Sequence, residues 1–369
     1  FVSFNYRIGR FGFFAHPALI KENPKGPLGN YGFMDQIAAL EWVKKNIGNF
    51  GGDANNVTLF GESAGGMSVL ALMSSPKANG LFQKAIIESG GGRNNILGPR
   101  KLNESTAQQP SAAAVGLEFA KSVGITGEDD AALVALRKLP VDTIVSGLNL
   151  AKFSPTFSGP ILDGQIVVEP SDVAFNAGRV MKIPIMAGAN SSDIGFSPAQ
   201  TMDQLFAPFG ANAEKARALY DPQNTQNVRA LSVIVGADGF MIEPARFLVK
   251  AMTQLGQPAY HFRFSYVAVS MRPQWAGAPH ATEIPFVFDT VLAKYGTSLK
   301  PEDEATARAA NAYWIAFART GKPSAMGQPA WPVYKTDTDI LLNFTNDGPV
   351  AQQDPWRARL DLVEAAIKK

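Results

Sequence analysis

Residues 57–66 read VTLFGESAGG, and this stretch decides the fold. Its first four residues are apolar or β-branched and predict a buried strand, while the small and apolar residues at its end predict a helix. Between the two lies G-x-S-x-G, a pattern in which a serine occupies a tight strand-to-helix turn. The flanking glycines leave room for the backbone, and the turn lifts the hydroxyl of Ser63 out of the sheet. Strand, turn and helix together indicate a nucleophile rather than an idle serine.

Strand and helix patterns alternate through the rest of the chain. The predicted strands are residues 1–6, 57–60, 84–87, 183–188 and 259–264, and the predicted helices are residues 33–47, 65–73, 112–123 and 302–320. This order is typical of a mostly parallel sheet flanked by helices, the α/β class. Residues 93–179 mix polar residues, prolines and helical stretches without evident strands. We therefore expect one α/β domain over residues 1–369, with residues 93–179 as an insertion that covers the site.

The composition restricts the classes of function. The chain has 369 residues, of which 46% are hydrophobic, and a formal net charge of +2. No Lys/Arg cluster forms a basic stripe and no apolar run is long enough to span a bilayer, so we expect neither a nucleic-acid partner nor a membrane span. The absence of cysteine excludes disulfides and thiolate metal sites, and three histidines are too few for a His-rich metal centre. We expect no cofactor and no metal.

The first residues, FVSFNYR, are typical of a strand already under way. They include neither an initiator Met nor the charged region of a signal peptide. The simplest interpretation is that the natural N-terminus lies upstream. This start leaves the localisation open, whether cytoplasmic or secreted. For the oligomeric state we expect a monomer or a weak homodimer.

A nucleophilic serine needs a base, and the base needs an orienting acid. His280 lies in a polar, turn-rich loop after the predicted strand at residues 259–264, and α/β folds place catalytic groups in such loops. His261 lies inside that strand between aromatic residues, where we expect a core or surface role. His16 lies beside Pro17 and is expected to be structural. His280 is therefore the predicted base.

Asp193 is the predicted acid. It lies in the loop just after a predicted strand, and the chain order Ser, Asp, His fits this fold. Asp163 is typical of a turn aspartate. Glu283 and Asp289 lie so near His280 in sequence that local loop or ion-pair roles are more natural for them. The same reasoning assigns the N–H of the residue after the nucleophile, Ala64, to the developing oxyanion near a helix N-terminus.

Further short motifs follow one another in order along nearly the whole chain. They are NYR at 5–7, GNYG at 29–32, FGGD at 50–53, GESAGG at 61–66, IESG at 87–90, PILDG at 160–164, GANSSDIG at 188–195, HATEIPFVF at 280–288, GKP at 321–323 and WPVY at 331–334. In these motifs the chain closely resembles the type-B carboxylesterase family of α/β-hydrolases. That family includes cholinesterases and bacterial para-nitrobenzyl esterases.

The resemblance implies an α/β-hydrolase fold and hydrolysis of carboxylic esters through an acyl-enzyme, without a cofactor. It implies Ser63 as nucleophile, His280 as base and Asp193 as acid. Many relatives carry Glu at the acid position, and because Asp has a shorter reach, its loop must come closer to the imidazole. Glu62 and Gly65 are then neighbours of the nucleophile rather than members of the triad.

The resemblance also points to a missing segment. Relatives carry upstream strands and a His-Gly-Gly loop that supplies the other backbone donors of the oxyanion hole, and residues 1–6 resemble the strand after that loop. A central strand beside residues 57–60 would then be absent. Three explanations remain open: the segment exists outside this chain, a neighbouring molecule fills the gap, or residues 1–6 shift to pair with residues 57–60. If the chain is complete as given, Ala64 is the one assured donor, and we expect reduced activity or substitute donors such as Gly65, Asn5 or a side chain near the lid.

We expect the substrates to be small to medium esters with apolar acyl or alcohol groups. Residues 93–179 would form part of the lid and pocket wall. The aromatic residues that could line the pocket, although core packing explains each of them equally well, are Phe153, Phe157, Phe196, Trp275 and Phe286. Two alternatives remain. One is a catalytically weak or silent binding module, because relatives of this fold have lost the triad, and the other is hydrolysis of amides, carbamates or lactones by the same triad.

Overall fold

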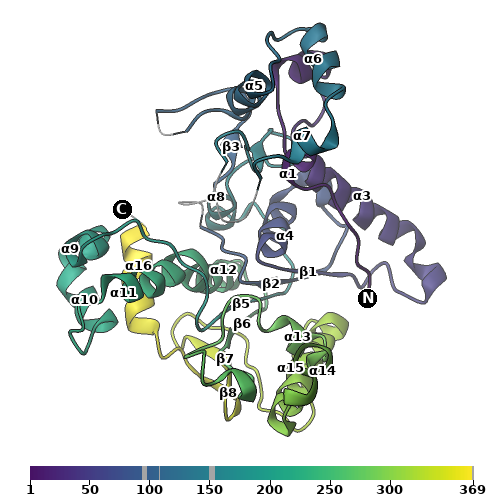
Figure 1. Cartoon of the computed structure of the whole chain (residues 1–369). Coiled ribbons are helices and arrows are strands. Elements are labelled where there is room, and N and C mark those ends of the chain that lie inside the picture. The colour runs from purple at the N-terminus through teal and green to yellow at the C-terminus, as the bar shows by residue number, and fades with distance from the viewer. Residues whose placement is uncertain (94–97, 108, 149–153, 368–369) are drawn as a thin grey trace. The chain divides into compact units, whose positions relative to one another are not determined.

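The computed structural model describes residues 1–93, 98–107, 109–148 and 154–367 (Figure 1). The chain forms two compact units. The first contains residues 1–55, 71–81 and 94–181, and the second contains residues 56–70, 82–93 and 182–369. The predicted insertion falls almost entirely in the first unit, where it groups with residues 1–55. That the chain is a single domain with this insertion as its lid stays a prediction.

The second unit is built on a six-stranded sheet with the strand order β1, β2, β5, β6, β7, β8 (Figure 1). The strands are β1 (Thr58–Glu62), β2 (Lys84–Glu88), β5 (Ile185–Asn190), β6 (Ala259–Phe264), β7 (Ile340–Thr345) and β8 (Gly348–Gln353). Neighbouring strands from β1 to β7 are parallel, and β8 is antiparallel to β7. The carboxyl ends of the parallel strands therefore meet at one edge, where α/β folds place functional loops. Four predicted strands are confirmed to within two residues at each end.

The predicted strand at residues 1–6 is wrong. Residues 1–8 have no regular secondary structure, and most of their side chains are exposed. A strand needs a partner for its N–H and C=O groups, so an apolar run does not become a strand by composition alone. The alternative in which this segment pairs with residues 57–60 is not found either, because in the described sheet β1 lies at the edge and pairs with β2.

The hairpin of β7 and β8 is absent from the predicted strands. Its two-residue turn is Asn346-Asp347, because Thr345 already pairs with Gly348, and Asn and Asp are favoured in hairpin turns. Proline is uncommon inside strands, so Pro349, the second residue of β8, hides this strand in a pattern search. The hairpin leads into α16 (Arg357–Ile367), the last helix of the described chain.

Helices cover both faces of the sheet. On one face α12 (Glu243–Gln254) packs against β5 and β6, and on the other α13 (Ile284–Val287) packs with α15 (Pro301–Thr320) (Figure 1). The prediction of a helix at residues 302–320 is confirmed, with Pro301 at its start and Gly321 in a left-handed cap at its end. The remaining helices of this unit are α9 (Met202–Phe206), α10 (Ala213–Tyr220), α11 (Val228–Ala237) and α14 (Val291–Tyr295).

An aromatic core lies between β6 and α15. Tyr260, Phe262 and Phe264 are buried and share one face of β6, because side chains alternate along a strand. The ring of Phe262 lies 5.1 Å from Trp314 in an edge-on arrangement, and Phe264 lies 5.4 Å from Phe286. Such pairs contribute about 0.5–1.5 kcal/mol each beyond their buried area. The first pair joins β6 to α15, and the second joins β6 to α13.

The alternate residues of β6 carry buried polar groups. Arg263 forms two 2.9 Å hydrogen bonds with Asp354, and neither side chain is appreciably exposed. His261 is 1% exposed, and burial lowers its pKa to about 4, so the ring is neutral near pH 7. Of the two roles expected for His261, core or surface, the structure shows the core role. On α12, Arg246 makes a similar buried pair with Asp339.

The first unit is mainly helical. Its helices are α1 (Gly9–Gly12), α2 (Pro17–Glu22), α3 (Tyr31–Asn46), α5 (Ala112–Ser122), α6 (Asp130–Arg137), α7 (Val141–Val145) and α8 (Ser171–Asn176), and a short parallel pair is formed by β3 (Arg100–Lys101) and β4 (Ile161–Leu162). The predicted helices at residues 33–47 and 112–123 are confirmed. His16 is fully buried and its Nδ1 accepts from the Ala18 N–H at 3.2 Å, so it caps α2 as a structural residue. Asp163 accepts from three backbone N–H groups of its own turn, as predicted.

α4 (Ala64–Ser74) follows β1, where a helix is predicted at residues 65–73. The short 3₁₀ and π segments are η1 (Ile47–Phe50), η2 (Pro76–Ala78), η3 (Ala207–Asn212), η4 (Asp238–Ile242), η5 (Val269–Met271) and η6 (Gly296–Ser298). Among the described residues, the helices lack the combination of length and hydropathy that a bilayer span requires.

Candidate active site

Ser63 lies on the turn between β1 and α4. Its φ is +57°, a left-handed conformation that costs a residue with a side chain about 1–3 kcal/mol. Its N–H donates to the carbonyl of Glu88 at 2.9 Å. A Cβ at Gly61 would lie 2.4 Å from the carbonyl carbon of Gly65, so this position tolerates no side chain. The strained turn that the sequence pattern predicts is therefore present.

Three side chains from distant parts of the sequence meet at this turn. Nε2 of His280 lies 2.9 Å from Oγ of Ser63, and Nδ1 of the same ring lies 2.6 Å from Oδ1 of Asp193. Both are hydrogen-bond distances. In this order the imidazole can take the hydroxyl proton while the carboxylate orients the ring and stabilises its charged form. The structure brings together the three residues named from the sequence, although their roles in a reaction stay a prediction.

The loops that carry the acid and the base are bonded to each other. The N–H of Ser192 donates to the carbonyl of Ala278 at 2.9 Å, and the N–H of Ala278 donates to Oγ of Ser191 at 3.0 Å. These bonds hold the backbone of the acid loop directly beside the backbone of the base loop. The short side chain of Asp193 therefore reaches His280 without a longer glutamate.

Asp193 is held in one orientation by several donors. It is 2% exposed, and its Oδ2 accepts from Oγ of Ser89 at 2.7 Å and from the N–H of Asn190 at 2.9 Å. Oδ1 accepts from the N–H of Ile194 at 2.8 Å in addition to its contact with His280. Hydrogen bonds to a buried carboxylate offset the loss of its hydration. The acid is thus fixed before any substrate arrives.

His280 is charged more readily than an isolated histidine. Burial lowers its pKa, but the hydrogen bond from its ring to Asp193 and the charges of Asp193 and Glu62 together raise the pKa above the ordinary value. Oε1 of Glu62 lies 3.1 Å from Nε2. This is an ion-pair contact rather than a directed hydrogen bond, because Oε1 has no hydrogen-bond partner among the described residues. Glu62 therefore adds negative charge beside the imidazole.

Two further glutamates lie at this edge of the sheet. Glu88 is opposite Glu62 in the β1–β2 register, and its Oε1 accepts from Nε1 of Trp314 at 2.7 Å. Burial, and to a smaller extent the charge of Glu62, raises the pKa of Glu88 to about 7, although the hydrogen bond from Trp314 lowers it. Burial and then the charge of Glu88 raise the pKa of Glu283 well above its ordinary value, and Asn190 donates to its Oε2. Among the described residues no cation pairs with either carboxyl group, so burial favours their protonated forms.

Glu88, Ser89 and Trp314 are not among the predicted site residues. The strand order is the observation that could have identified them. Because β2 lies between β1 and β5, its carboxyl end falls between the turn of Ser63 and the loop of Asp193. Chain spacing does not reveal that order. In the described part of the chain, no group of three or more His, Asp or Glu side chains could hold a metal ion.

The predicted oxyanion donor, Ala64, is the first residue of α4. The first N–H groups of a helix have no partner within the helix, so those of Ala64 and Gly65 are free of intrahelical bonds close to Ser63. The helix N-terminus also favours negative charge. Their role as oxyanion donors stays a prediction.

The predicted pocket residues have different surroundings. Phe153 lies outside the described residues, and Phe157 is half-buried in the first unit. Phe196 is 56% exposed with its ring 5.8 Å from Phe240, and Trp275 is half-buried. Phe286 needs a correction: it is 1% exposed and packs into the aromatic core, so its ring is not available to line a pocket.

The chain matches a family model and several relatives along most of its length. The model of the Carboxylesterase family matches residues 1–228 and 210–360. The chain is 32% identical over 356 residues to fumonisin B1 esterase of Sphingopyxis macrogoltabida, covering 92% of this chain and 63% of that protein. It is 31% identical over 375 residues to para-nitrobenzyl esterase of Bacillus subtilis, covering 96% and 70%, and 30% identical over 400 residues to carboxylesterase 5A of Canis lupus familiaris, covering 98% and 65%.

The chain thus spans 63–70% of the length of these relatives. The match runs over nearly all of this chain, through the Ser63 turn, the Asp193 loop and the His280 loop. The mostly parallel sheet with helices on both faces is the α/β-hydrolase fold of the matching family, as predicted. This chain belongs to the carboxylesterase family.

Proposed function

We propose that the chain hydrolyses carboxylic esters through an acyl-enzyme on Ser63. The observation that carries this proposal is the 2.9 Å contact between Oγ of Ser63 and Nε2 of His280, with Asp193 2.6 Å behind the ring. Membership of the carboxylesterase family supports the reaction class. Both supports are needed, because the chain spans about two thirds of its relatives.

In the first step Oγ of Ser63 attacks the ester carbonyl carbon while Nε2 of His280 takes the hydroxyl proton. The resulting imidazolium lies between the carboxylates of Asp193 and Glu62, which stabilise its positive charge. The N–H of Ala64 donates to the oxyanion. His280 then gives its proton to the leaving alcohol, and the acyl group stays on Ser63.

In the second step a water molecule replaces the alcohol. His280 takes a proton from that water, the hydroxide attacks the acyl carbon, and the carboxylic acid leaves as Ser63 regains its proton. No step uses a group other than these side chains, backbone donors and water. Because the base must be neutral to accept a proton, kcat/KM should rise with pH through the raised pKa of His280.

The substrate class we propose is small to medium carboxylic esters with apolar acyl or alcohol groups. Two relatives are named for the esters they act on, fumonisin B1 esterase and para-nitrobenzyl esterase, and the second name makes para-nitrobenzyl and para-nitrophenyl esters suitable probes. If Ala64 is the sole backbone donor at the oxyanion, turnover should be about 100- to 1000-fold below that of an enzyme with a further donor.

The test is turnover of para-nitrophenyl acetate, butyrate and octanoate by the wild type, Ser63→Ala and a control, Ser68→Ala. Ser68 lies on the same helix and bonds to the carbonyl of Ala64, so the control reports any general disturbance of α4. We expect turnover and labelling by a fluorescent organophosphonate to disappear in Ser63→Ala and to persist in Ser68→Ala. Equal labelling of all three proteins would overturn the proposal.

The alternatives give different results in the same experiment. A catalytically silent binding module would show neither turnover nor labelling in the wild type. An amidase would cleave para-nitroanilides at least as fast as the matched para-nitrophenyl esters. Either result would contradict the ester hydrolase assignment.

A further inference from the structure

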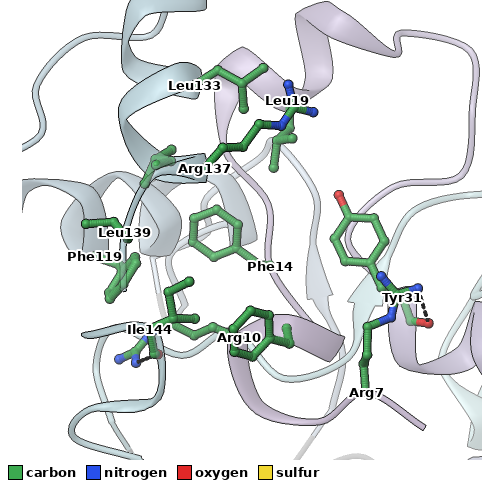
Figure 2. A pocket seen from close by; sticks show the side chains of 12 residues that line it. Arg7, Arg10, Phe14, Leu19, Tyr31, Phe119, Leu133, Arg137, Leu139 and Ile144 are labelled. Atoms are coloured by element: carbon green, nitrogen blue, oxygen red, sulfur yellow. Dashed lines mark hydrogen bonds between the residues drawn. The ribbon is translucent and has the colours of Figure 1, made fainter. Parts of the chain in front are cut away.

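The first unit contains a cavity of about 320 Å³ that includes none of the proposed triad residues (Figure 2). Its volume is at the low end of the range for ligand sites, about 300–1,000 Å³. In the close-up, the ring of Phe14 lies between Phe119 and Leu139 on one side and Tyr31 on the other. The lining comes from several segments of the first unit, including α3, α5, α6 and α7.

The walls of this cavity are mostly apolar. Phe119 on α5, Leu136 on α6 and Ile144 on α7 face it together with Phe14. Phe14 and Phe119 meet edge to face at 5.8 Å and give the wall a fixed shape. Such a surface suits a hydrocarbon chain or a ring rather than a hydrated ion.

Two of the three arginines that line the cavity are neutralised. Arg7 pairs with Asp35 at 2.7 Å, and Arg137 pairs with Glu22 at 2.7 Å. In both pairs the arginine side chain is about half exposed, at 51% and 57%. These pairs contribute no net charge to the cavity.

The third arginine, Arg10, is 5% exposed and has only neutral acceptors. Nη1 donates to the carbonyls of Ile144 at 2.7 Å and Ser146 at 2.9 Å, Nε donates to the carbonyl of Thr156 at 3.0 Å, and Nη2 donates to Oγ1 of Thr156 at 2.6 Å. The guanidinium lies over the ring of Phe119 at 4.3 Å. Two of these neighbours, Ile144 and Phe119, themselves line the cavity, so the charged group belongs to its wall.

No carboxylate pairs with Arg10 among the described residues, which include every Asp and Glu of the chain. Buried charges are normally paired with an opposite charge because desolvation is costly. Burial lowers the pKa of Arg10, which is the electrostatic sign of that missing partner. Of the five N–H bonds of a guanidinium, four have acceptors among the described residues, which leaves one N–H on Nη2 without an acceptor there.

We propose that this cavity binds an organic monocarboxylate, with its apolar chain against Phe14 and Leu139 and its carboxylate beside Arg10. A single negative charge matches the single unneutralised cation, and one free N–H suits one carboxylate oxygen better than a phosphate, which needs several donors. The apolar wall accounts for the hydrocarbon part. This inference goes beyond the proposed ester hydrolysis and does not depend on it.

The experiment is calorimetric titration of octanoate, with octan-1-ol as the uncharged analogue of the same chain length. We expect the wild type to bind octanoate at least tenfold more tightly than octan-1-ol. Arg10→Met should weaken octanoate binding at least tenfold and change octan-1-ol binding less than twofold, whereas Arg10→Lys should stay within about threefold of the wild type. Equal affinity for the two ligands in the wild type would overturn the proposal.

A second pair of variants leaves Arg10 in place, because its loss also removes bonds to three backbone carbonyls. Leu139→Trp fills the cavity and should abolish octanoate binding, while Val134→Trp, on the exposed side of α6, should not. Octanoate binding that survives in Leu139→Trp would contradict this location. Ser63→Ala should bind octanoate as the wild type does, so failure of the hydrolase proposal and failure of this one give different results.

Discussion

His280 and Arg10 are both largely buried, but their surroundings differ. His280 lies between two carboxylates, Asp193 at 2.6 Å and Glu62 at 3.1 Å. In the described part of the chain, Arg10 meets four neutral oxygen atoms and no carboxylate. The first arrangement places two negative charges beside a base that becomes positive in the proposed reaction. The second carries a permanent charge without a counter-ion, which is the condition of a binding site for an anion.

Asp193→Asn should have the largest effect on turnover, because it changes the carboxylate that contacts His280. Both carboxylate oxygens of Asp193 accept hydrogen bonds, but an amide has one acceptor oxygen and a donor NH2 in place of the other. The amide cannot satisfy all these donors at once, so the ring loses its tautomer and its stabilising charge. We expect kcat for para-nitrophenyl butyrate to fall about 10⁴-fold with KM little changed. Asp163→Asn is the matched control, because that aspartate accepts only turn N–H groups. A fall of less than tenfold in Asp193→Asn would mean that this residue is not the acid.

Arg263→Met tests what a buried ion pair contributes when one partner is removed. The variant leaves the charge of Asp354 buried and unpaired, so we expect the free energy of unfolding to fall by about 3–5 kcal/mol, measured by urea denaturation. Arg137→Met removes the exposed partner of Glu22 and should lower the free energy of unfolding far less, because water screens an exposed pair. Equal losses in both variants would contradict this distinction between buried and exposed charge.

Glu88→Gln should change the pH dependence of stability. The pKa of Glu88 is raised from 4.5 to about 7 in the folded chain, so the native state binds more protons than the unfolded state between these values. Its contribution to stability is therefore fully present below the unfolded pKa and is lost as pH rises through the folded pKa. The slope is at most about 1.4 kcal/mol per pH unit.

In Glu88→Gln the decline in stability between pH 5 and 7 should become smaller, measured by the thermal midpoint and by the fluorescence of the adjacent Trp314. Glu104→Gln changes an exposed glutamate on the surface and should leave the slope unchanged. Identical slopes in the wild type and in Glu88→Gln would show that Glu88 is already ionised in the folded protein.

Ser89→Ala should have the smallest effect. It removes one of the donors that hold Asp193 and leaves the backbone bonds from Asn190 and Ile194 in place. A hydrogen bond to a charged group contributes about 1.5–3 kcal/mol, and the lower value corresponds to a factor of about ten. We therefore expect kcat to fall about tenfold with KM unchanged. A rise in KM without a change in kcat would assign Ser89 to substrate binding instead.

The elements that position Ser63 could be predicted from the sequence because they depend on neighbouring residues. The strand, the turn with Gly61 and the helix are encoded within ten consecutive positions. The meeting of His280 with Ser63 could be expected from motif order and the resemblance, but its distance could not, because it depends on bonds between two loops. Those bonds involve backbone groups that have no sequence signature.

The remaining differences have the same cause. The apolar residues 1–6 lack a pairing strand, and Phe286 joins the core because α13 packs beside α15; both outcomes are set by neighbours distant in sequence. Glu88 and Trp314 are 226 positions apart, yet they share a hydrogen bond behind the triad. Arg10 is unremarkable in sequence, and only the positions of Ile144, Ser146 and Thr156 reveal a buried charge without a counter-ion.

The most direct test of the proposed reaction is to trap the covalent intermediate. The wild type should be mixed with para-nitrophenyl butyrate, quenched in acid during turnover, and examined by intact and peptide mass spectrometry. The proposed chemistry predicts one butyryl group per chain, on the peptide that carries Ser63, and none in Ser63→Ala. Turnover of the ester with no acyl group on that peptide, or with the group on another residue, would contradict it.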